Sequence, residues 1–408
     1  MDTYLIDRLG LQGDGIAAGP VFAPRTLPGE RVRGRLDGDR LTDIAIEEPV
    51  AARVSPPCPQ YRACGGCQLQ HASDDFVAGW KQDIVRAALE AQGLAAPIRQ
   101  IHSSPPASRR RAVFSARRTK KGVLAGFHGR ASDVIVDVPD CRVIAPELHQ
   151  GRALAAALAS VGTSRKGELK VLVTRALQGL DVAVEGGKPL DVALRMALAE
   201  LAQSHGVARL TWAGETVAME APPEQRFGAA VVSPPPGAFL QATGEGEAAL
   251  VAAVREAVAD AAHLVDLFAG CGTFALPLAA RASVHAVEGS GPMLAALDRG
   301  WRQASGLRNV TTETRDLFRD PLLGPELRAF DAAVIDPPRA GAVAQTAALA
   351  EDGPPRIAFV SCNPVTFARD ARVLTQAGYR MAWLDVVDQF RWSPHVELVA
   401  SFLRDGAD

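Results

Sequence analysis

The six cysteines of this chain are the residues most able to act as nucleophiles or metal ligands, and they lie in different sequence settings. Cys58, Cys64 and Cys67 lie within one short segment, and Cys141 follows at a distance. Three clustered thiols with a distant fourth predict a site for a metal ion or a metal cluster. The spacing alone supports zinc and an iron–sulfur cluster about equally, because ligation by cysteine suits both. Cys271 fills a small-residue position in a glycine turn, and we assign it no chemistry.

Cys362 lies in the segment SCNP, between a predicted strand and a predicted helix. A thiol near a helix N-terminus is expected to have a lowered pKa and to act as a nucleophile. A thiolate that adds to carbon-6 of a uracil activates carbon-5 for methylation, and a base must then remove the carbon-5 proton. Glu397, in the segment HVELVA, is the candidate base. The alternatives are an inert buried cysteine and a glutamate at the edge of an apolar strand.

Three carboxylates accompany a glycine turn of sequence DLFAGCGT. The turn lacks the third glycine of a pyrophosphate-binding fingerprint, which favours a nucleotide without a pyrophosphate. Glu288, Asp316 and Asp336 come at or near the ends of successive predicted strands, where open α/β sheets bind ligands. Glu288 is suitably placed to accept the ribose hydroxyls. The set predicts S-adenosylmethionine, although each acid alone could equally be a helix cap or a turn residue.

The elements that must position these residues divide the chain into three predicted domains. Residues 1–55 contain short alternating runs broken by glycine, which predict an OB-like β-barrel of about five strands. Residues 56–235 mix strands and helices and predict an α+β domain. Residues 236–408 alternate regularly between strands and helices, which predicts a doubly wound, mostly parallel α/β sheet.

Charge and hydropathy indicate what kind of partner the protein binds, a polyanion rather than a membrane. The net charge is -2, yet the segment 99–130 holds nine Lys or Arg and no Asp or Glu. Because nothing in that segment neutralises the charge, contact with a polyanion is favoured over a solvated surface. No apolar run reaches the ~18 to 20 residues that span a bilayer. The N-terminus lacks the features of a secretory signal. We therefore expect a cytoplasmic protein without a membrane partner, whose cysteines are ligands or catalysts.

Motifs spread along nearly the whole chain combine these signals: GDGIA, LPGE, CPxYxxCGGCxLQH, FLQ, VDLFAGCGTF, VEG, DPPRAG, SCNP with ARD, and HVE. Together they resemble the uracil-5 RNA methyltransferase family, most closely its 23S rRNA branch. The resemblance implies an N-terminal TRAM barrel, a central α+β domain with a [4Fe-4S] cluster, and a C-terminal Rossmann-like class I methyltransferase domain. It also implies a role for each matching residue: Cys58, Cys64, Cys67 and Cys141 as cluster ligands; Cys362 as nucleophile; Glu397 as base; Gln241, Phe268, Thr273, Glu288, Asp316 and Asp336 as S-adenosylmethionine contacts; and Phe239 near the target pocket.

The resemblance favours an iron–sulfur cluster over zinc, and 23S rRNA over tRNA, because the tRNA branch generally lacks both barrel and cluster. We expect a monomer. The alternatives are a tRNA uridine-5 methyltransferase and a non-catalytic RNA-binding iron–sulfur protein. A cytosine-5 enzyme would need a Pro-Cys motif where this chain has Asp-Pro-Pro-Arg, and an amine methylase would need an aromatic residue in place of Arg339. The sequence departs from the family at four positions that concern cofactor or target contacts: Thr243, Thr273, Arg391 and Pro394.

Overall fold

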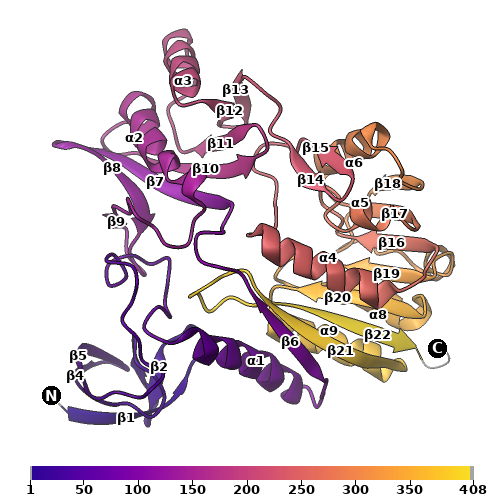
Figure 1. Ribbon diagram of the computed structural model, residues 1–408, viewed down its shortest axis with the longest axis horizontal. Helices are drawn as coiled ribbons and strands as arrows, with labels where there is room; N and C mark the ends of the chain where they lie inside the picture. Colours follow the sequence, from indigo (N-terminus) through magenta and orange to yellow (C-terminus); the bar gives the residue numbers. More distant parts are fainter. Residues whose placement is uncertain (1, 405–408) are drawn as a thin grey trace.

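A computed structural model describes residues 2–404 of the chain and contains a closed barrel and two large sheets (Figure 1). The barrel has the strand order β1-β2-β3-β5-β4. Its strands are β1 (Asp2–Leu9), β2 (Gly15–Ala17), β3 (Val21–Ala23), β4 (Arg31–Asp37) and β5 (Arg40–Glu48). The side chains of Ile6, Val32 and Leu41 fill its small core. Gly15 leaves the space that the barrel needs, because a Cβ there would lie 2.0 Å from Thr26 Oγ1. The expected five-stranded barrel is confirmed.

The central sheet has seven strands in the order β13-β12-β11-β10-β7-β8-β9. Its strands are β7 (Arg111–Thr119), β8 (Gly122–His128), β9 (Ile135–Val136), β10 (Glu168–Ala176), β11 (Gly179–Glu185), β12 (Val207–Trp212) and β13 (Glu215–Met219). The single turn η1 (Pro146–Leu148) leads into α2 (Gln150–Gly162), and α2 and α3 (Val192–Ser204) pack together against the sheet. The fully buried Trp212 side chain requires Gly162 and Gly187, because a Cβ at either would lie about 2 Å from its ring.

The C-terminal sheet has eight strands in the order β18-β17-β16-β19-β20-β22-β21-β6. Its strands are β6 (Ile98–Ser103), β16 (His263–Leu267), β17 (Ser283–Glu288), β18 (Val310–Thr314), β19 (Ala332–Ile335), β20 (Arg356–Ser361), β21 (Tyr379–Asp388) and β22 (Glu397–Arg404). The order places β16 inside the sheet, with the parallel neighbours β17 and β19 on its two sides. Such a sheet binds ligands beyond the carboxyl ends of its strands. The prediction of a doubly wound, mostly parallel sheet is confirmed.

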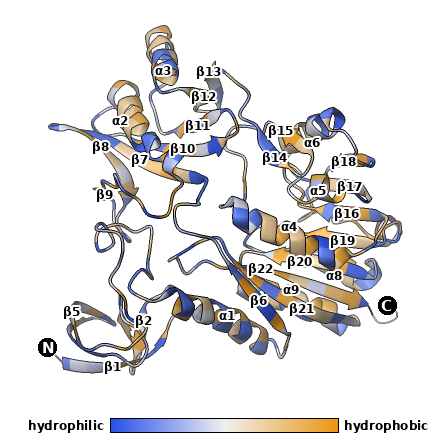
Figure 2. Ribbon diagram, in the orientation of Figure 1, coloured by the Kyte–Doolittle hydropathy of each residue, from blue (hydrophilic) through white to orange (hydrophobic). Residues whose placement is uncertain are grey.

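Helices cover both faces of this sheet, whose central strands are hydrophobic (Figure 2). The helices are α4 (Gly244–Val258), α5 (Ala275–Leu278), α6 (Gly291–Gln303), α7 (Gly324–Leu327), α8 (Val343–Asp352) and α9 (Pro364–Gln376). A small hairpin of β14 (Gln225–Phe227) and β15 (Ala230–Val232) packs on α6. No helix in residues 2–404 combines the length and the apolar character that crossing a membrane requires.

Two elements from the segment 56–235 join the C-terminal sheet instead of the central one. Strand β6 pairs with β21 in parallel, and helix α1 (Asp74–Glu90) packs against α9 and β21. The fully buried ammonium of Lys81, on α1, forms an ion pair with Asp388 at the end of β21 and donates to the carbonyl of Phe390 at 3.2 Å. The division at residues 55 and 235 remains a prediction about folding units, but the segment between them contributes to two sheets.

Candidate active site

The turn after β16 forms one wall of the site. Phe268, Gly270 and Gly272 adopt positive φ angles of 65°, 56° and 94°, a conformation in which glycine is favoured and a phenylalanine is uncommon. Glu288 at the end of β17 accepts hydrogen bonds from the backbone N–H of Gly270 at 3.1 Å and of Ser290 at 2.9 Å. The carboxylate predicted to bind a ribose therefore lies against the glycine turn, as a nucleotide site of this kind requires.

Two further carboxyl groups gather beside this turn. Asp266 is fully buried, and neither of its side-chain oxygens has a hydrogen-bond partner among the described residues. Burial and the nearby Asp336 raise its pKa well above the usual value. Burial also raises the pKa of Asp336 to about 7. Thr273 lies half-buried between the glycine turn and α5.

An aromatic pair lies at the next strand end, where Phe318 extends the predicted set. The rings of Phe268 and Phe318 lie 5.4 Å apart with a tilt of 55°, and Phe318 is 48% exposed. Asp316 accepts a hydrogen bond from the backbone N–H of Phe318 at 3.1 Å. Exposed aromatic faces beside a carboxylate suit the planar base of a nucleoside. Sequence reasoning missed Phe318, although an aromatic two residues after Asp316 was a usable signal.

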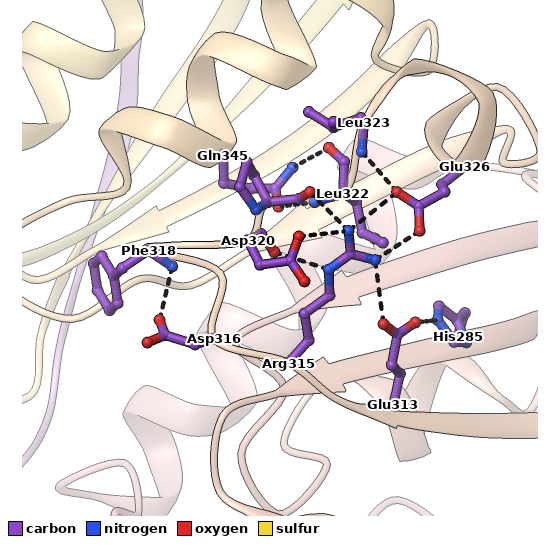
Figure 3. Close-up of polar contacts among 11 residues, drawn as sticks. His285, Glu313, Arg315, Asp316, Phe318, Asp320, Leu322, Leu323, Glu326 and Gln345 are labelled. Carbon is purple, nitrogen blue, oxygen red and sulfur yellow. Dashed lines mark hydrogen bonds and ion pairs between the residues drawn. The ribbon is translucent and has the colours of Figure 1, made fainter.

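Figure 3 shows how Arg315 braces the loop that carries Asp316 and Phe318. Its guanidinium pairs with Glu313 at 3.2 Å, Asp320 at 3.1 Å and Glu326 at 2.6 Å, which raises the pKa of Arg315. Gln345 of α8 binds both backbone polar groups of Leu322 in the same loop. This network fixes the loop on the side away from Phe318.

Cys362 lies between β20 and α9, as predicted, and is half-buried. Asn363 caps α9 through the backbone N–H of Val365 and donates to the carbonyl of Arg339 at 3.0 Å, which ties SCNP to DPPR. The expectation of a lowered thiol pKa is wrong for this structure. Burial, together with Glu397 and Asp336, raises the pKa of Cys362 to about 11, and these effects outweigh Arg339. The resting thiol is therefore protonated at neutral pH.

Glu397 begins β22 and comes close to the end of β20, where Ser361 is paired with Leu398. The glutamate is 3% exposed, and burial and Asp336 raise its pKa to about 8. Strand β20 pairs with β19 on one side and with β22 on the other, so Asp336 after β19, Cys362 after β20 and Glu397 at the start of β22 lie at one edge of the sheet. Glu397 and Asp336 both raise the pKa of Cys362, and Asp336 also raises that of Glu397. A buried carboxyl with a raised pKa beside a thiol suits proton transfer near neutral pH.

The FLQ motif reaches the same edge from the segment before α4. Gln241 is 1% exposed, and its side-chain oxygen accepts from Gln389 at 2.6 Å. Arg110 donates to the carbonyl of Gln241 at 2.8 Å, and Arg111 donates to the carbonyl of Leu240 at 3.3 Å. These two arginines hold the motif through its backbone. Phe239 is 58% exposed beside the guanidinium of Arg111. Thr243, where the family usually has Asn, caps α4 by accepting from Gly246 N.

The basic segment 99–130 is less free than the sequence predicted. Four of its arginines pair with acids that lie far away along the chain: Arg99 with Asp385 and Glu256, Arg110 with Glu247, Arg117 with Glu168, and Arg130 with Asp14. The expectation that nothing nearby neutralises this charge was therefore wrong for these four, because folding brings in the partners. Lys120 and Lys121 remain exposed at the turn between β7 and β8.

The four cysteines Cys58, Cys64, Cys67 and Cys141 line one cavity of about 400 Å³. Burial raises the pKa of Cys64, and raises that of Cys67 to about 12, and the neighbouring thiols add to both shifts. Within residues 2–404, no group of three His, Cys, Asp or Glu side chains is arranged to hold a metal ion. The structure thus brings the predicted ligands to one cavity without showing an assembled metal site.

Arg109 supplies an independent test of what this cavity can hold. Its guanidinium lines the cavity, and burial lowers its pKa, whereas Cys67 and Cys141 act in the opposite direction. No carboxylate in the described part of the chain pairs with it; its guanidinium lies over the Phe390 ring at 5.5 Å. A buried cation is costly without an anion nearby. A metal cluster bound by thiolates carries negative charge, so the donor set and its surroundings fit such a group.

Comparison with known proteins settles the family. A family model described as tRNA (Uracil-5-)-methyltransferase matches residues 234–404. The 23S rRNA (uracil(1939)-C(5))-methyltransferase RlmD of Chromohalobacter salexigens is 33% identical, over 99% of this chain and 90% of its own. The chain belongs to the uracil-5 RNA methyltransferase family. An RNA methyltransferase of Rhizobium meliloti, itself described as uncharacterized, is 45% identical over 98% of both chains.

Membership of the uracil-5 RNA methyltransferase family confirms the resemblance inferred from the motifs. The chain is therefore an S-adenosylmethionine-dependent RNA methyltransferase that acts on uracil carbon-5. The crystal structure of Pyrococcus abyssi tRNA (uracil-54, C5)-methyltransferase with S-adenosyl-L-homocysteine has the same fold. It superposes with a TM-score of 0.76 over 98% of this chain and 99% of that one, at 21% sequence identity.

Proposed function

We propose that this enzyme methylates carbon-5 of a uridine in 23S rRNA, with Cys362 as nucleophile and Glu397 as base. The observation that carries the proposal is the pairing of β19, β20 and β22, which brings Asp336, Cys362 and Glu397 to one edge of the sheet, beside the turn after β16 that bears Phe268. The choice of 23S rRNA rests on the similarity to RlmD along the whole chain. A tRNA substrate is the second candidate, because the related Pyrococcus abyssi enzyme acts on tRNA.

The side chains can complete the reaction as follows. The half-buried Cys362 thiol gives its proton to solvent. Its sulfur then adds to carbon-6, so that the electrons of the carbon-5–carbon-6 double bond become available at carbon-5. Bound S-adenosylmethionine would supply the electrophilic methyl group for carbon-5 and would leave as S-adenosylhomocysteine. Glu397 then removes the carbon-5 proton. The electrons of that C–H bond re-form the double bond, and the carbon–sulfur bond breaks to release Cys362 as a thiolate. The uridine must leave its stack to reach this edge.

We also infer the residues that hold S-adenosylmethionine. Glu288 and the glycine turn suit the ribose, and Phe268, Phe318 and Asp316 suit the adenine. The remaining proposed contacts to S-adenosylmethionine, on the side of its methyl group, come from Gln241, Thr273 and Asp336. The barrel, which we propose to be a TRAM domain, and the exposed Lys120 and Lys121 would contact the RNA backbone. We further propose that the enzyme acts as a monomer in the cytoplasm.

The cavity formed by the four cysteines is the proposed site of a [4Fe-4S] cluster. Cys58, Cys64, Cys67 and Cys141 would bind its iron atoms as thiolates, and Arg109 would balance part of the negative charge. Such a cluster supplies structural cross-linking or electron transfer, depending on its setting.

Protein purified without oxygen is expected to be brown and to contain about four irons per chain, the content of one [4Fe-4S] cluster. Cys141→Ser should lower the iron content because it removes the distant ligand. Cys362→Ala is the matched control: it removes a thiol outside the cavity and should retain the iron. Iron analysis and the visible absorption spectrum measure both. Colourless wild-type protein with stoichiometric zinc would contradict the cluster.

The proposed function is tested by mapping 5-methyluridine in the ribosomal and transfer RNA of a strain that lacks the gene. Loss of the modification from 23S rRNA, restored by the wild-type gene and not by the Cys362→Ala gene, is the expected result. Loss from tRNA alone would establish the second candidate. Unchanged methylation in both RNAs, together with RNA binding by the purified protein, would favour a non-catalytic binding protein.

A further inference from the structure

Gln389 is the first residue after β21, at the start of the loop 389–396 that leads to Glu397. It lies outside the motifs that predicted the site. Its side chain is nonetheless 2% exposed and reaches the centre of that site. A buried amide must find partners for its donor and acceptor groups, so its contacts are informative.

Three hydrogen bonds fix this amide. The nitrogen donates to the side-chain oxygen of Gln241 at 2.6 Å and to Oε2 of Glu397, and the oxygen accepts from the backbone N–H of Thr243 at 3.3 Å. Two acceptors lie on the nitrogen side and one donor lies on the oxygen side. If the amide were flipped, its oxygen would face two acceptor oxygens and its nitrogen would face an N–H donor, so all three hydrogen bonds would be lost.

Packing also confines the side chain. Gly246 lies in the first turn of α4, and a Cβ at that position would be 2.7 Å from Cβ of Gln389 and 3.0 Å from its Oε1. Thr243, whose N–H binds the amide, is anchored by its own hydroxyl to Gly246 N at 3.0 Å and to the hydroxyl of Ser104 at 2.7 Å. Gln389 is thus held between α4 and the base.

We propose that Gln389 is a positioning residue that holds Glu397 ready to accept the carbon-5 proton and ties it to the FLQ motif. This inference rests on the proposed function and deepens it. An amide nitrogen has two hydrogens, and both are used here, one on Gln241 and one on Glu397. The bond therefore stabilises the carboxylate form of Glu397. The hydrogen bond engages Oε2 of Glu397, and the carbon-5 proton is assigned to the other oxygen, Oε1.

The charges around Glu397 make this donor important. Asp336, after β19, acts with burial to raise the pKa of Glu397, and the Gln389 hydrogen bond lowers it. The Cys362 thiol, after β20, is the other titratable group that interacts with Glu397, and Arg339 acts on that thiol. Among the other charges at this loop, Asp388 is paired with Lys81, Glu247 with Arg110 and Arg391 with Asp74. Arg109 lies over the Phe390 ring, and burial together with Arg339, Lys81 and Arg109 lowers the pKa of His395, so that neither group opposes the effect of Asp336 through a hydrogen bond to Glu397. Gln389 is therefore the neutral group that opposes the raised pKa.

The test is the pH dependence of turnover, measured as the release of methylated RNA, for wild type and Gln389→Met across about pH 6–10. The wild-type rate should rise with pH through about 8, because Glu397 acts as a base only when ionised. Gln389→Met removes the donor while nearly keeping the volume. It should move this rise about one pH unit higher and lower kcat near neutral pH about ten- to hundredfold, as expected for a lost hydrogen bond to a charged group. KM for RNA should change less than about threefold, because ground-state binding is retained.

Two further variants separate positioning from stability. Gln225→Met also removes a buried glutamine amide. Gln225 lies in β14, and its side-chain nitrogen donates to the carbonyl of Arg175 at 2.7 Å. It should lower the melting temperature without moving the pH profile. Gln389→Glu, nearly the same size, replaces the permanent donor with a second carboxyl group and should move the profile upward as well.

Wild-type pH profiles in both Gln389 variants would overturn the inference. So would a uniform fall in kcat at every pH that matches the loss of stability in Gln225→Met. If Gln389→Met does not fold, the profile of Gln389→Glu decides. Failure of the proposed function is distinct, since the wild-type enzyme itself would then transfer no methyl group to uridine.

Discussion

Cys362→Ala is expected to abolish methyl transfer, by about 10⁴-fold or more, as removal of a covalent nucleophile does in other enzymes. Without the sulfur, carbon-6 receives no nucleophile and carbon-5 cannot attack the methyl group. The measurement is transfer of labelled methyl groups to RNA transcribed in vitro from the ribosomal gene.

Binding of S-adenosylmethionine serves as the internal control for this variant. The cofactor turn and Phe318 belong to other strand ends than Cys362, so the affinity should stay within about threefold of wild type by calorimetry. Turnover that persists in Cys362→Ala would remove this residue as nucleophile. Loss of both transfer and cofactor binding would indicate a folding defect, and the milder Cys362→Ser should then be tested in the same assays.

Glu397→Gln is expected to trap the enzyme on its substrate. Addition of Cys362 and methyl transfer do not need the carboxylate as the carbon-5 base, but elimination does, so a covalent protein–RNA adduct should accumulate. Turnover should fall about 10²- to 10⁴-fold, the usual contribution of a general base. A band of protein with attached RNA on a denaturing gel, formed only when S-adenosylmethionine is present, measures the effect.

The double variant Cys362→Ala/Glu397→Gln is the matched control, since it has no sulfur to form the adduct. If Glu397→Gln releases methylated RNA at the wild-type rate, another group is the base. Because Glu397 also affects the pKa of Cys362, slow formation of the adduct would show that the carboxylate helps to remove the thiol proton as well. Rapid-quench measurements of adduct formation distinguish this effect from slow elimination.

The positions of Glu288, Asp336 and Cys362 were predictable because each of these residues ends or closely follows a recognisable strand. Parallel strands deliver their carboxyl ends to one edge, so Glu288, Asp336 and Cys362 could be expected together from their positions alone. Gln389 could not be found in the same way. It begins a loop rather than ending a motif, and its partners Gln241 and Glu397 come from two other parts of the chain.

The electrostatic predictions failed where they depended on the distant parts of the fold. Position at a helix N-terminus suggested a lowered pKa for Cys362, but burial and two carboxyl groups from other strands outweigh that effect. Carboxylates from distant segments also neutralise Arg99 and Arg117, whose acidic partners lie outside the basic segment. A sequence pattern shows which charges are close along the chain, whereas the pKa of a thiol and the pairing of an arginine depend on which segments come together in the fold.

Strand β6 has a consequence for the way the polypeptide is made. It is synthesised early, yet its partner β21 lies near the C-terminal end of the described chain, where Ile98 is paired with Leu384. The ribosome must therefore release most of the chain before the edge of the catalytic sheet can close. A gene fragment that begins at residue 236 would leave the β21 edge open to pairing with other chains. The C-terminal sheet thus needs β6, from the N-terminal part of the chain, to cover its edge. We therefore expect the fragment from residue 236 onward to be unsuited to independent expression.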